Sequence, residues 1–214
     1  MEFDAIVLAG GRSSRMGAEK SGLLFEGRSL VEVAVSAARA ARRVVVVGPG
    51  ATADAIASAT GDARIARVLT AREEPAWGGP AAALVAGLDR LAADPARNDT
   101  AEWLLVLACD LPRGDEAAAA LVAAAVAHTS TACEAVVAVD GSGRRQPLLA
   151  LYRTDAVARA AASARKRNDL VGLPLRRLVG TLDTVEVCIN DALCADVDTP
   201  DQARAFGIQV AAVI

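Results

Sequence analysis

Histidine and aromatic residues are scarce in this sequence of 214 residues, which has one histidine and only 3% aromatic residues. A single histidine excludes zinc sites built from several histidines and leaves Ser-His-Asp catalysis with little support. We interpret that residue, His128, as the end of a predicted Ala-rich helix. The shortage of aromatic rings also argues against a surface on which nucleic-acid bases stack, so no nucleic-acid partner is expected.

Closely spaced cysteines and long apolar runs are missing as well. The four cysteines form no C-x-x-C pair and have no evident partner base, so we interpret all of them as small core residues: Cys109, Cys133, Cys188 and Cys194. No segment has the charged-then-apolar pattern of a secretion signal, and no apolar run is long enough to span a bilayer. The expected location is a reduced cytoplasm, without membrane association.

Charges of the two signs nearly cancel. The chain has 23 Lys and Arg residues against 26 Asp and Glu residues, for a formal net charge of −3. This balance gives no overall field that would attract nucleic acid or an anionic membrane, so any anion site must be local. The length and apolar content suit one core, and we expect residues 1–214 to form a single domain.

A glycine-rich basic loop follows the first predicted strand. The run Ala5–Ala9 is apolar at every position, as in parallel strands that are covered on both faces, and Gly10 and Gly11 end it. Ligands of open α/β sheets bind at the carboxyl ends of the strands, where glycines let them approach the backbone. The loop carries three cations that could bind anionic oxygens: Arg12, Arg15 and Lys20. This pattern favours a polyphosphate ligand.

The spacing of this loop differs from that of the common phosphate motifs. Two residues separate Lys20 from Gly17, unlike the lysine of a Walker A loop, and Gly10-Gly11 does not begin a G-x-G-x-x-G fingerprint. The alternative interpretation is an ordinary glycine turn with solvated basic side chains.

The rest of the sequence alternates between predicted strands and helices. Further strands are expected at Arg43–Val47, Arg67–Thr70, Trp103–Cys109, Glu134–Val139, Gln146–Tyr152, Thr184–Ile189 and Ala195–Val197. Helices are expected at Ser29–Ala41, Ala51–Ala59, Ala81–Ala92, Asp115–His128, Thr154–Ser163, Gly172–Val179 and from Pro200 onward. The turn Asp140–Gly143 joins two strands directly, as in an antiparallel pair. We therefore expect an α/β fold of three layers: a doubly wound, mostly parallel sheet with one antiparallel strand and helices on both faces.

Three helix starts carry capping signals. Ser29 with Glu32, and Thr199 with Gln202, match the capping box, and Asp115 is expected to cap a third helix. Residues 72–80 form a second glycine-rich loop, and Pro80 suits the first position of the helix that follows. This loop is the second candidate ligand loop.

Carboxylates follow two predicted strands near the same edge of the sheet. Asp110 comes directly after a strongly apolar strand, where it could hold Mg²⁺ against triphosphate oxygens. Alternatively, an Asp between a strand and a proline caps a turn with its own side chain. Either Asp196 or Asp198 could complete the metal site; otherwise Asp198 supports the helix cap at Thr199 and Asp196 is solvated.

Several motifs, taken in order, resemble those of the molybdenum cofactor guanylyltransferase family. They are Leu8–Lys20 (LAGGRSSRMGAEK), Gly78–Pro80 (GGP), Cys109–Pro112 (CDLP), Gln146–Leu148 (QPL) and Asp196–Pro200 (DVDTP). The likeness runs nearly end to end, and the first motif is typical of the wider nucleotidyltransferase superfamily. It implies a Rossmann-like fold and an enzyme that transfers GMP from Mg²⁺-GTP to a phosphate of molybdenum-loaded molybdopterin, with release of pyrophosphate.

The resemblance also implies roles for individual residues. The nucleotide would be lined by Leu8, Ala9, Gly10, Gly11, Arg12, Lys20, Gly79 and Pro80. Either Glu73 or Glu74 would accept hydrogen bonds from the guanine edge. The acceptor would contact Gln146, Arg176 and Arg177, and Mg²⁺ would bind Asp110. Of the two aspartates that could complete the metal site, we take Asp198 as the candidate ligand, with Asp196 as the alternative. Catalysis would depend on Arg15, Lys20 and Asp110.

The implied chemistry is direct in-line attack by an acceptor phosphate oxygen, which needs no protein nucleophile and no general base. The family often has Asn where this chain has Asp196 and Asp198, so a cytidylyltransferase on the same cofactor or a sugar-phosphate nucleotidyltransferase stays an alternative. A regulatory module that binds nucleotide without turnover is a further alternative, although the presence of both Lys20 and Asp110 argues against it. Transient protein partners that deliver the cofactor are compatible with this interpretation.

Overall fold

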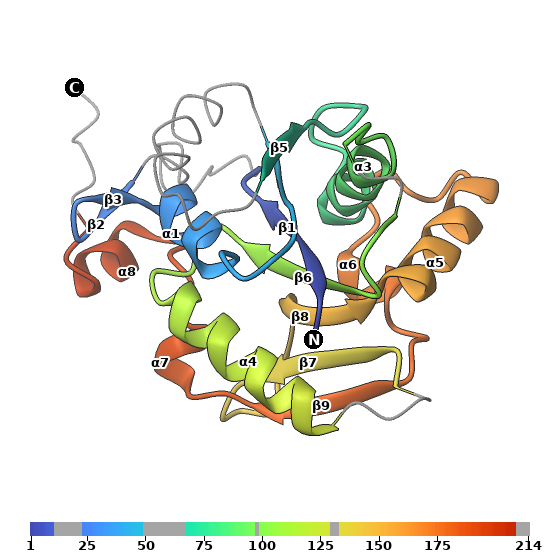
Figure 1. Ribbon diagram of the computed structural model, residues 1–214. Coiled ribbons are helices and arrows are strands. Elements are labelled where there is room, and N and C mark those ends of the chain that lie inside the picture. The colour runs from blue at the N-terminus through green and yellow to red at the C-terminus, as the bar shows by residue number, and fades with distance from the viewer. Residues whose placement is uncertain (11–22, 49–66, 97–98, 129–132, 209–214) are drawn as a thin grey trace.

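The computed structural model describes residues 1–10, 23–48, 67–96, 99–128 and 133–208, and its centre is one seven-stranded sheet (Figure 1). The strands are β1 (Phe3–Leu8), β4 (Val44–Val47), β5 (Val68–Ala71), β6 (Trp103–Ala108), β7 (Ala135–Val139), β8 (Arg145–Arg153) and β9 (Thr184–Cys188). They lie side by side in the order β5-β4-β1-β6-β8-β7-β9. Two further short strands, β2 (Leu24–Phe25) and β3 (Arg28–Ser29), form a separate hairpin.

One strand of the main sheet is antiparallel to the others, as the sequence predicts. β8 pairs antiparallel with both β6 and β7, whereas β1, β4, β5 and β6 pair parallel with one another and β9 pairs parallel with β7. The tight turn before β8 causes the reversal. Its Asp140 carboxylate accepts hydrogen bonds from the backbone N–H groups of Ser142 and Arg144, each at 3.0 Å, so the chain returns at once beside β7.

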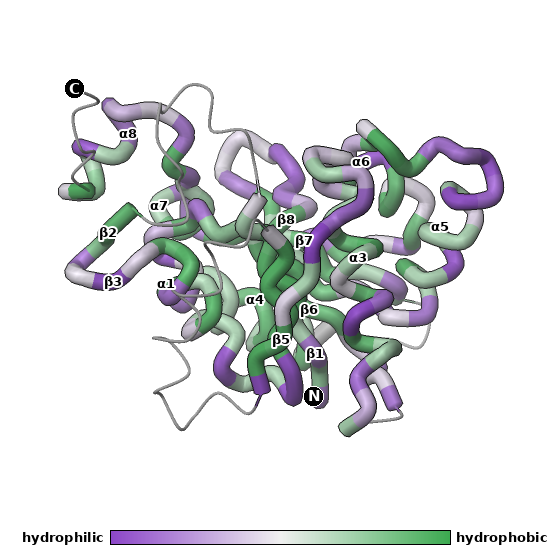
Figure 2. The backbone as a smooth tube through the Cα atoms, turned by 90° about the horizontal axis from the view of Figure 1, so that it is seen from above, coloured by the Kyte–Doolittle hydropathy of each residue, from purple (hydrophilic) through white to green (hydrophobic). Residues whose placement is uncertain are grey.

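Helices cover both faces of the sheet and make the three layers that the sequence predicts (Figure 2). One core lies between the sheet and α1 (Leu30–Ala37), α4 (Gly114–His128) and α7 (Asp191–Cys194). The other lies between the sheet and α3 (Pro80–Ala92), α5 (Thr154–Lys166) and α6 (Leu175–Leu178). Alternate residues of β1 enter the two cores, Ala5 and Val7 the first and Ile6 the second, which explains why the strand is apolar at every position.

Both predicted capping boxes are present. The Ser29 hydroxyl accepts a hydrogen bond from the Glu32 backbone N–H, and the Glu32 carboxylate accepts one in return from the Ser29 N–H. The same exchange between Thr199 and Gln202 starts the last helix, α8 (Pro200–Ala205). α1 ends at Ala37, before the predicted end, because the chain then turns to hydrogen-bond with β1.

Several details of the sequence prediction are wrong. Residues 195–197 are not a strand: the Val197 N–H donates to the Asp110 carbonyl, and this bond is not part of a strand pairing. Cys188 is exposed at the end of β9, whereas the other three cysteines are buried.

The ends of three helices also differ from the prediction. Asp115 lies inside the first turn of α4, where its carboxylate accepts a hydrogen bond from the Glu116 N–H, so it is not the capping residue before the helix. α5 runs three residues beyond Ser163, and α6 is shorter than Gly172–Val179.

A buried ion-pair network joins the strands at their amino ends. The Arg43 side chain is 0% exposed and donates two hydrogen bonds to the Asp4 carboxylate, at 3.2 and 2.7 Å. It also donates to the carbonyl oxygens of Leu91 and Asp99, at 3.0 and 2.9 Å. This guanidinium therefore fixes β1, β4 and the segment after α3 to one another.

Among the described residues, no helix is both long enough and apolar enough to cross a membrane.

Candidate functional site

The candidate site lies at the carboxyl ends of β1, β4, β5 and β6, which meet at one edge because these strands are parallel. Leu8 and Ala9 are buried there, and Gly10 is the first exposed residue after β1. The Ala9 N–H donates to the Val47 carbonyl at 2.8 Å, and the Cys109 N–H donates to the Leu8 carbonyl at 3.1 Å. The start of the predicted nucleotide loop is therefore held between its two neighbouring strands.

Gly48, at the end of β4, borders this loop and was not predicted as a site residue. A Cβ atom added to Gly48 would lie 3.0 Å from both the carbonyl carbon and the oxygen of Ala9. A side chain at this position would require the Ala9 backbone to shift by a few tenths of an ångström, and backbone atoms yield less readily than a flexible side chain. The sequence signal was the Gly48-Pro49-Gly50 run that closes the strand, but its contact with Ala9 follows from the sheet.

The structure distinguishes the two glutamates that the sequence left as alternatives. Glu73 is buried, with 8% of its surface exposed, whereas Glu74 is exposed. The Glu73 Oε1 atom accepts a hydrogen bond from the Trp77 backbone N–H at 3.3 Å and would lie 3.8 Å from a Cβ atom built on Gly10. Glu73 is thus the carboxylate that the fold brings beside the end of β1.

The loop that carries Glu73 is compact because glycines allow close backbone contacts. The Gly78 N–H donates to the Pro75 carbonyl at 3.0 Å, and a Cβ atom on Gly78 would lie 2.9 Å from that same oxygen. Gly79 has a φ of 90° and precedes α3, with Pro80 at the first helical position as predicted. Gly79 is half-buried and Pro80 is exposed.

Asp110 and the Asp196–Asp198 segment come together, as the sequence suggested. The Val197 N–H donates to the Asp110 carbonyl at 3.0 Å, and the three aspartates at positions 110, 196 and 198 are half-buried. The Asp198 backbone N–H donates to the Gln202 side chain at 2.9 Å, so its main chain takes part in the cap of α8. The cap itself uses the Thr199 hydroxyl, which leaves the Asp198 carboxylate outside the capping box.

Asp110 and Asp198 are chemically suited to Mg²⁺, which prefers oxygen ligands and is often held by one or two carboxylates together with substrate phosphates and water. Among the residues that the structure describes, no group of three or more His, Cys, Asp or Glu side chains could hold a metal by itself. Mg²⁺ has an octahedral shell, so at a site with these two carboxylates the other positions would go to substrate phosphates and water.

The predicted acceptor residues lie on two different elements. Gln146 is near the start of β8, and its amide Nε2 donates to the Asp140 carboxylate at 2.9 Å. The hydrogen bond from the Ser142 hydroxyl is the main reason that the pKa of Asp140 lies below its ordinary value. Arg176 and Arg177 are exposed on α6, on the opposite face of the sheet from α4.

Four predicted site residues lie outside the described part of the chain: Gly11, Arg12, Arg15 and Lys20. The predicted helix Ala51–Ala59 lies outside it as well.

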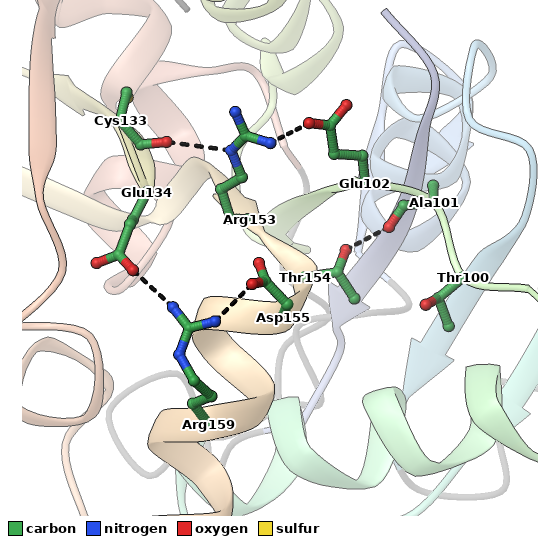
Figure 3. A pocket seen from close by; sticks show the side chains of 9 residues that line it. All are labelled: Thr100, Ala101, Glu102, Cys133, Glu134, Arg153, Thr154, Asp155 and Arg159. Atoms are coloured by element: carbon green, nitrogen blue, oxygen red, sulfur yellow. Dashed lines mark hydrogen bonds and ion pairs between the residues drawn. The ribbon is translucent and has the colours of Figure 1, made fainter. Parts of the chain in front are cut away.

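A pocket of about 410 Å³ lies at the other edge of the sheet, near the start of β6 and the end of β8 (Figure 3). Arg159 in this pocket forms ion pairs with Glu134 at 2.7 Å and with Asp155 at 2.5 Å, and Arg153 pairs with Glu102. Each charged side chain of the pocket is therefore ion-paired, with three carboxylates against two guanidinium groups. None of the residues predicted to bind nucleotide, acceptor or metal lines it.

Comparisons with known proteins identify the family of the chain. The MobA-like NTP transferase domain model matches residues 5–185. A Bacillus cereus (strain AH820) protein named "Probable molybdenum cofactor guanylyltransferase" is 27% identical over 154 residues, which are 71% of this chain and 68% of the relative. A Geobacillus sp. (strain WCH70) protein of the same name is 28% identical over 148 residues, 69% of this chain and 68% of the relative.

Solved structures share the fold at lower sequence identity. Molybdopterin-guanine dinucleotide biosynthesis protein A from Archaeoglobus fulgidus is 18% identical with a TM-score of 0.64, over 95% of this chain and 96% of that one. The 2-C-methyl-D-erythritol 4-phosphate cytidylyltransferase from Thermus thermophilus is 18% identical with a TM-score of 0.63, over 96% of this chain and 97% of that one. These likenesses establish the fold, whereas the family model covers most of the chain. The chain therefore belongs to the MobA-like NTP transferase domain family and is a nucleotidyltransferase related to molybdenum cofactor guanylyltransferases.

Proposed function

We propose that the protein transfers GMP from Mg²⁺-GTP to molybdenum-loaded molybdopterin in the cytoplasm and releases pyrophosphate. The names of its curated relatives support the acceptor. One observation supports guanine: the buried carboxylate of Glu73 lies beside Gly10 at the end of β1. Guanine presents two donors, N1–H and N2–H₂, that a carboxylate can accept together, whereas the equivalent edge of cytosine carries acceptors at N3 and O2.

In the proposed reaction an oxygen of the acceptor phosphate attacks the α-phosphorus of GTP in line. The new bond joins that oxygen to the α-phosphorus, the bond from the α-phosphorus to the bridging oxygen breaks, and pyrophosphate leaves with the electron pair. The acceptor oxygen is already anionic, so no general base is required. Arg15 and Lys20 stabilise the negative charge around phosphorus and on the leaving group.

Positioning is the main task of the described residues. The narrow approach of Gly48 to Ala9 fixes the backbone on which the nucleotide lies, and Glu73 orients the base. Asp110 and Asp198 would hold Mg²⁺, which neutralises charge on the triphosphate when it is bound. Gln146, Arg176 and Arg177 would contact the acceptor.

The second candidate is transfer of CMP to the same acceptor. It is favoured by Asp196 and Asp198, at positions where the guanylyltransferases often have Asn. The carboxylate of Glu73 would then face the acceptor atoms of cytosine, which is unfavourable for an ionised group.

The test is transfer of α-labelled GMP, CMP, AMP or UMP from each Mg²⁺-NTP to molybdenum-loaded molybdopterin. We expect GTP-selective transfer, and we expect Asp110→Ala to reduce turnover by about 100-fold or more while the protein stays folded. Glu73→Gln should relax the preference for GTP over CTP, and Glu74→Gln is the matched control because Glu74 is exposed. CTP-selective transfer by the wild type would refute the guanine assignment, and near-normal turnover of Asp110→Ala would refute the metal assignment.

A further inference from the structure

Trp77 is unusual because it exposes a large aromatic side chain to solvent, although the chain has few aromatic residues. The chain has three Phe, two Trp and one Tyr, and all six lie within the described residues. Trp77 is 48% exposed, whereas Phe3, Trp103 and Tyr152 are buried and Phe25 packs edge-on against Phe206. Since tryptophan is enriched at binding interfaces, the exposure of this side chain indicates a ligand contact more than a role in packing.

The backbone at Trp77 is held in a conformation that its side chain makes unfavourable. Its φ is 66°, in the left-handed region, which costs a non-glycine residue about 1 kcal/mol or more. The Trp77 N–H donates to the Glu73 carboxylate, and the following residue, Gly78, donates to Pro75. These bonds fix the direction in which the indole leaves the loop. Residues kept in such conformations cluster at binding sites.

A second exposed apolar side chain belongs to the neighbouring loop. The Gly172 N–H donates to the Gly78 carbonyl at 2.7 Å, and Val171 beside it is 60% exposed. Only three other large apolar side chains in the described part of the chain are exposed: Met1, Leu24 and Val126. Two of these five side chains thus belong to two loops that are hydrogen-bonded to each other at the nucleotide edge.

We propose that the Trp77 indole is the surface on which the base of the bound nucleotide stacks, an inference that rests on the proposed function. The same carboxylate, Glu73, accepts from the Trp77 backbone and borders Gly10. A planar base whose edge hydrogen-bonds to Glu73 therefore has its face within reach of the side chain four residues later in the loop. Stacking tolerates any base, so Glu73 provides the selectivity and Trp77 provides affinity.

The binding test uses the full-length protein with Mg²⁺-GTP and the other three Mg²⁺-NTPs, measured by calorimetry. Trp77→Ala should weaken nucleotide binding about tenfold, whereas Trp77→Phe, which keeps an aromatic face, should stay within about threefold. Val126→Ala removes an exposed apolar side chain from α4 and should leave the affinity unchanged. The unfolding midpoint of each variant controls for a structural effect.

A fluorescence titration gives a readout that a structural role would not change. The chain has only two tryptophans, and Trp103 is 3% exposed. Stacking of a base on Trp77 should quench the tryptophan emission of the wild type, and Trp77→Phe, in which Trp103 is the remaining tryptophan, should lose that quenching. A free tryptophan analogue in the same solutions corrects for absorption of light by the nucleotide.

The possible outcomes separate this inference from the proposed function. GTP binding without quenching, and with equal affinity in Trp77→Ala, overturns the stacking inference and leaves the proposed function intact. Binding and quenching by CTP in place of GTP support stacking but refute the guanine assignment. Quenching by a free pterin and not by nucleotide overturns the inference, because it assigns the indole to the acceptor. Absence of binding by every nucleotide overturns both proposals.

Discussion

Removing the negative charge of Asp4 should destabilise the fold without damaging the nucleotide site. The Asp4 carboxylate accepts three hydrogen bonds: two from Arg43, at 3.2 and 2.7 Å, and one from the Ala101 N–H at 3.0 Å. In Asp4→Asn an amide NH₂ replaces one of the two oxygens, so a donor would face the N–H donors of Arg43 or Ala101. The buried positive charge of Arg43 also loses its closest counterion.

The expected loss is about 3–5 kcal/mol of unfolding free energy, the usual cost of leaving one member of a buried ion pair uncompensated. Asp94 moderates this loss because one of its oxygens lies 3.5 Å from Arg43 Nη1, so the lower half of the range is the better expectation. For a domain of this size, about 3 kcal/mol corresponds to a decrease in the unfolding midpoint of roughly 6–12 °C.

Chemical unfolding followed by circular dichroism would measure this loss, with Glu2→Gln as the control. Glu2 is 82% exposed and lies 3.7 Å from Arg42, so its removal should change stability by less than about 1 kcal/mol. The double variant with Asp4→Leu and Arg43→Met should recover part of the stability, because no buried charge stays unpaired. A change below about 1 kcal/mol in Asp4→Asn would show that Arg43 does not depend on this carboxylate, and the reasoning would be refuted.

Two further predictions concern the other edge of the sheet. Gly48→Ala should cost about 1–3 kcal/mol and weaken nucleotide binding, because the added Cβ atom would lie 3.0 Å from the Ala9 backbone; unchanged stability and affinity would contradict this close approach. The folded-state pKa of Asp140 is lowered, so the stability that it contributes is present above its unfolded pKa of about 3.9 and is lost as the pH falls through its folded pKa. Unfolding measured between about pH 5 and pH 2 should therefore show a shallower acid loss in Asp140→Asn than in the wild type, and parallel pH profiles would contradict this linkage.

The sheet could be predicted because its strands carry strong local signals. β1, β4 and β6 are buried on both faces and therefore read as unbroken apolar runs. The turn at Asp140 identified an antiparallel pair, although only the pairing in the sheet shows that β8 lies between β6 and β7. Helix starts with two reciprocal side-chain bonds were equally predictable.

The errors fall where a single tertiary contact replaces a local pattern. The alternation Asp196-Val197-Asp198 resembles a strand, but the backbone bond from Val197 to Asp110 is not part of a ladder among the described residues. The hairpin of β2 and β3 escaped prediction because each strand has two residues and its turn is Glu26-Gly27, not the usual Asn-Gly or Asp-Gly. Burial separates Glu73 from Glu74, and nothing in two adjacent identical residues could have done so.

The two edges of the sheet have different kinds of stabilisation, and this difference bears on how the site works. At the amino ends, a buried guanidinium and its carboxylates tie three segments together. At the carboxyl ends, the loops that contain Gly78 and Gly172 are held by glycines in close contact and by single hydrogen bonds. Since the buried ion pairs fix the strands at the opposite edge, the register of the sheet does not depend on the loops that would contact the nucleotide. Substitutions at the amino ends should therefore change stability and leave base preference unchanged, whereas those at Glu73 should do the reverse.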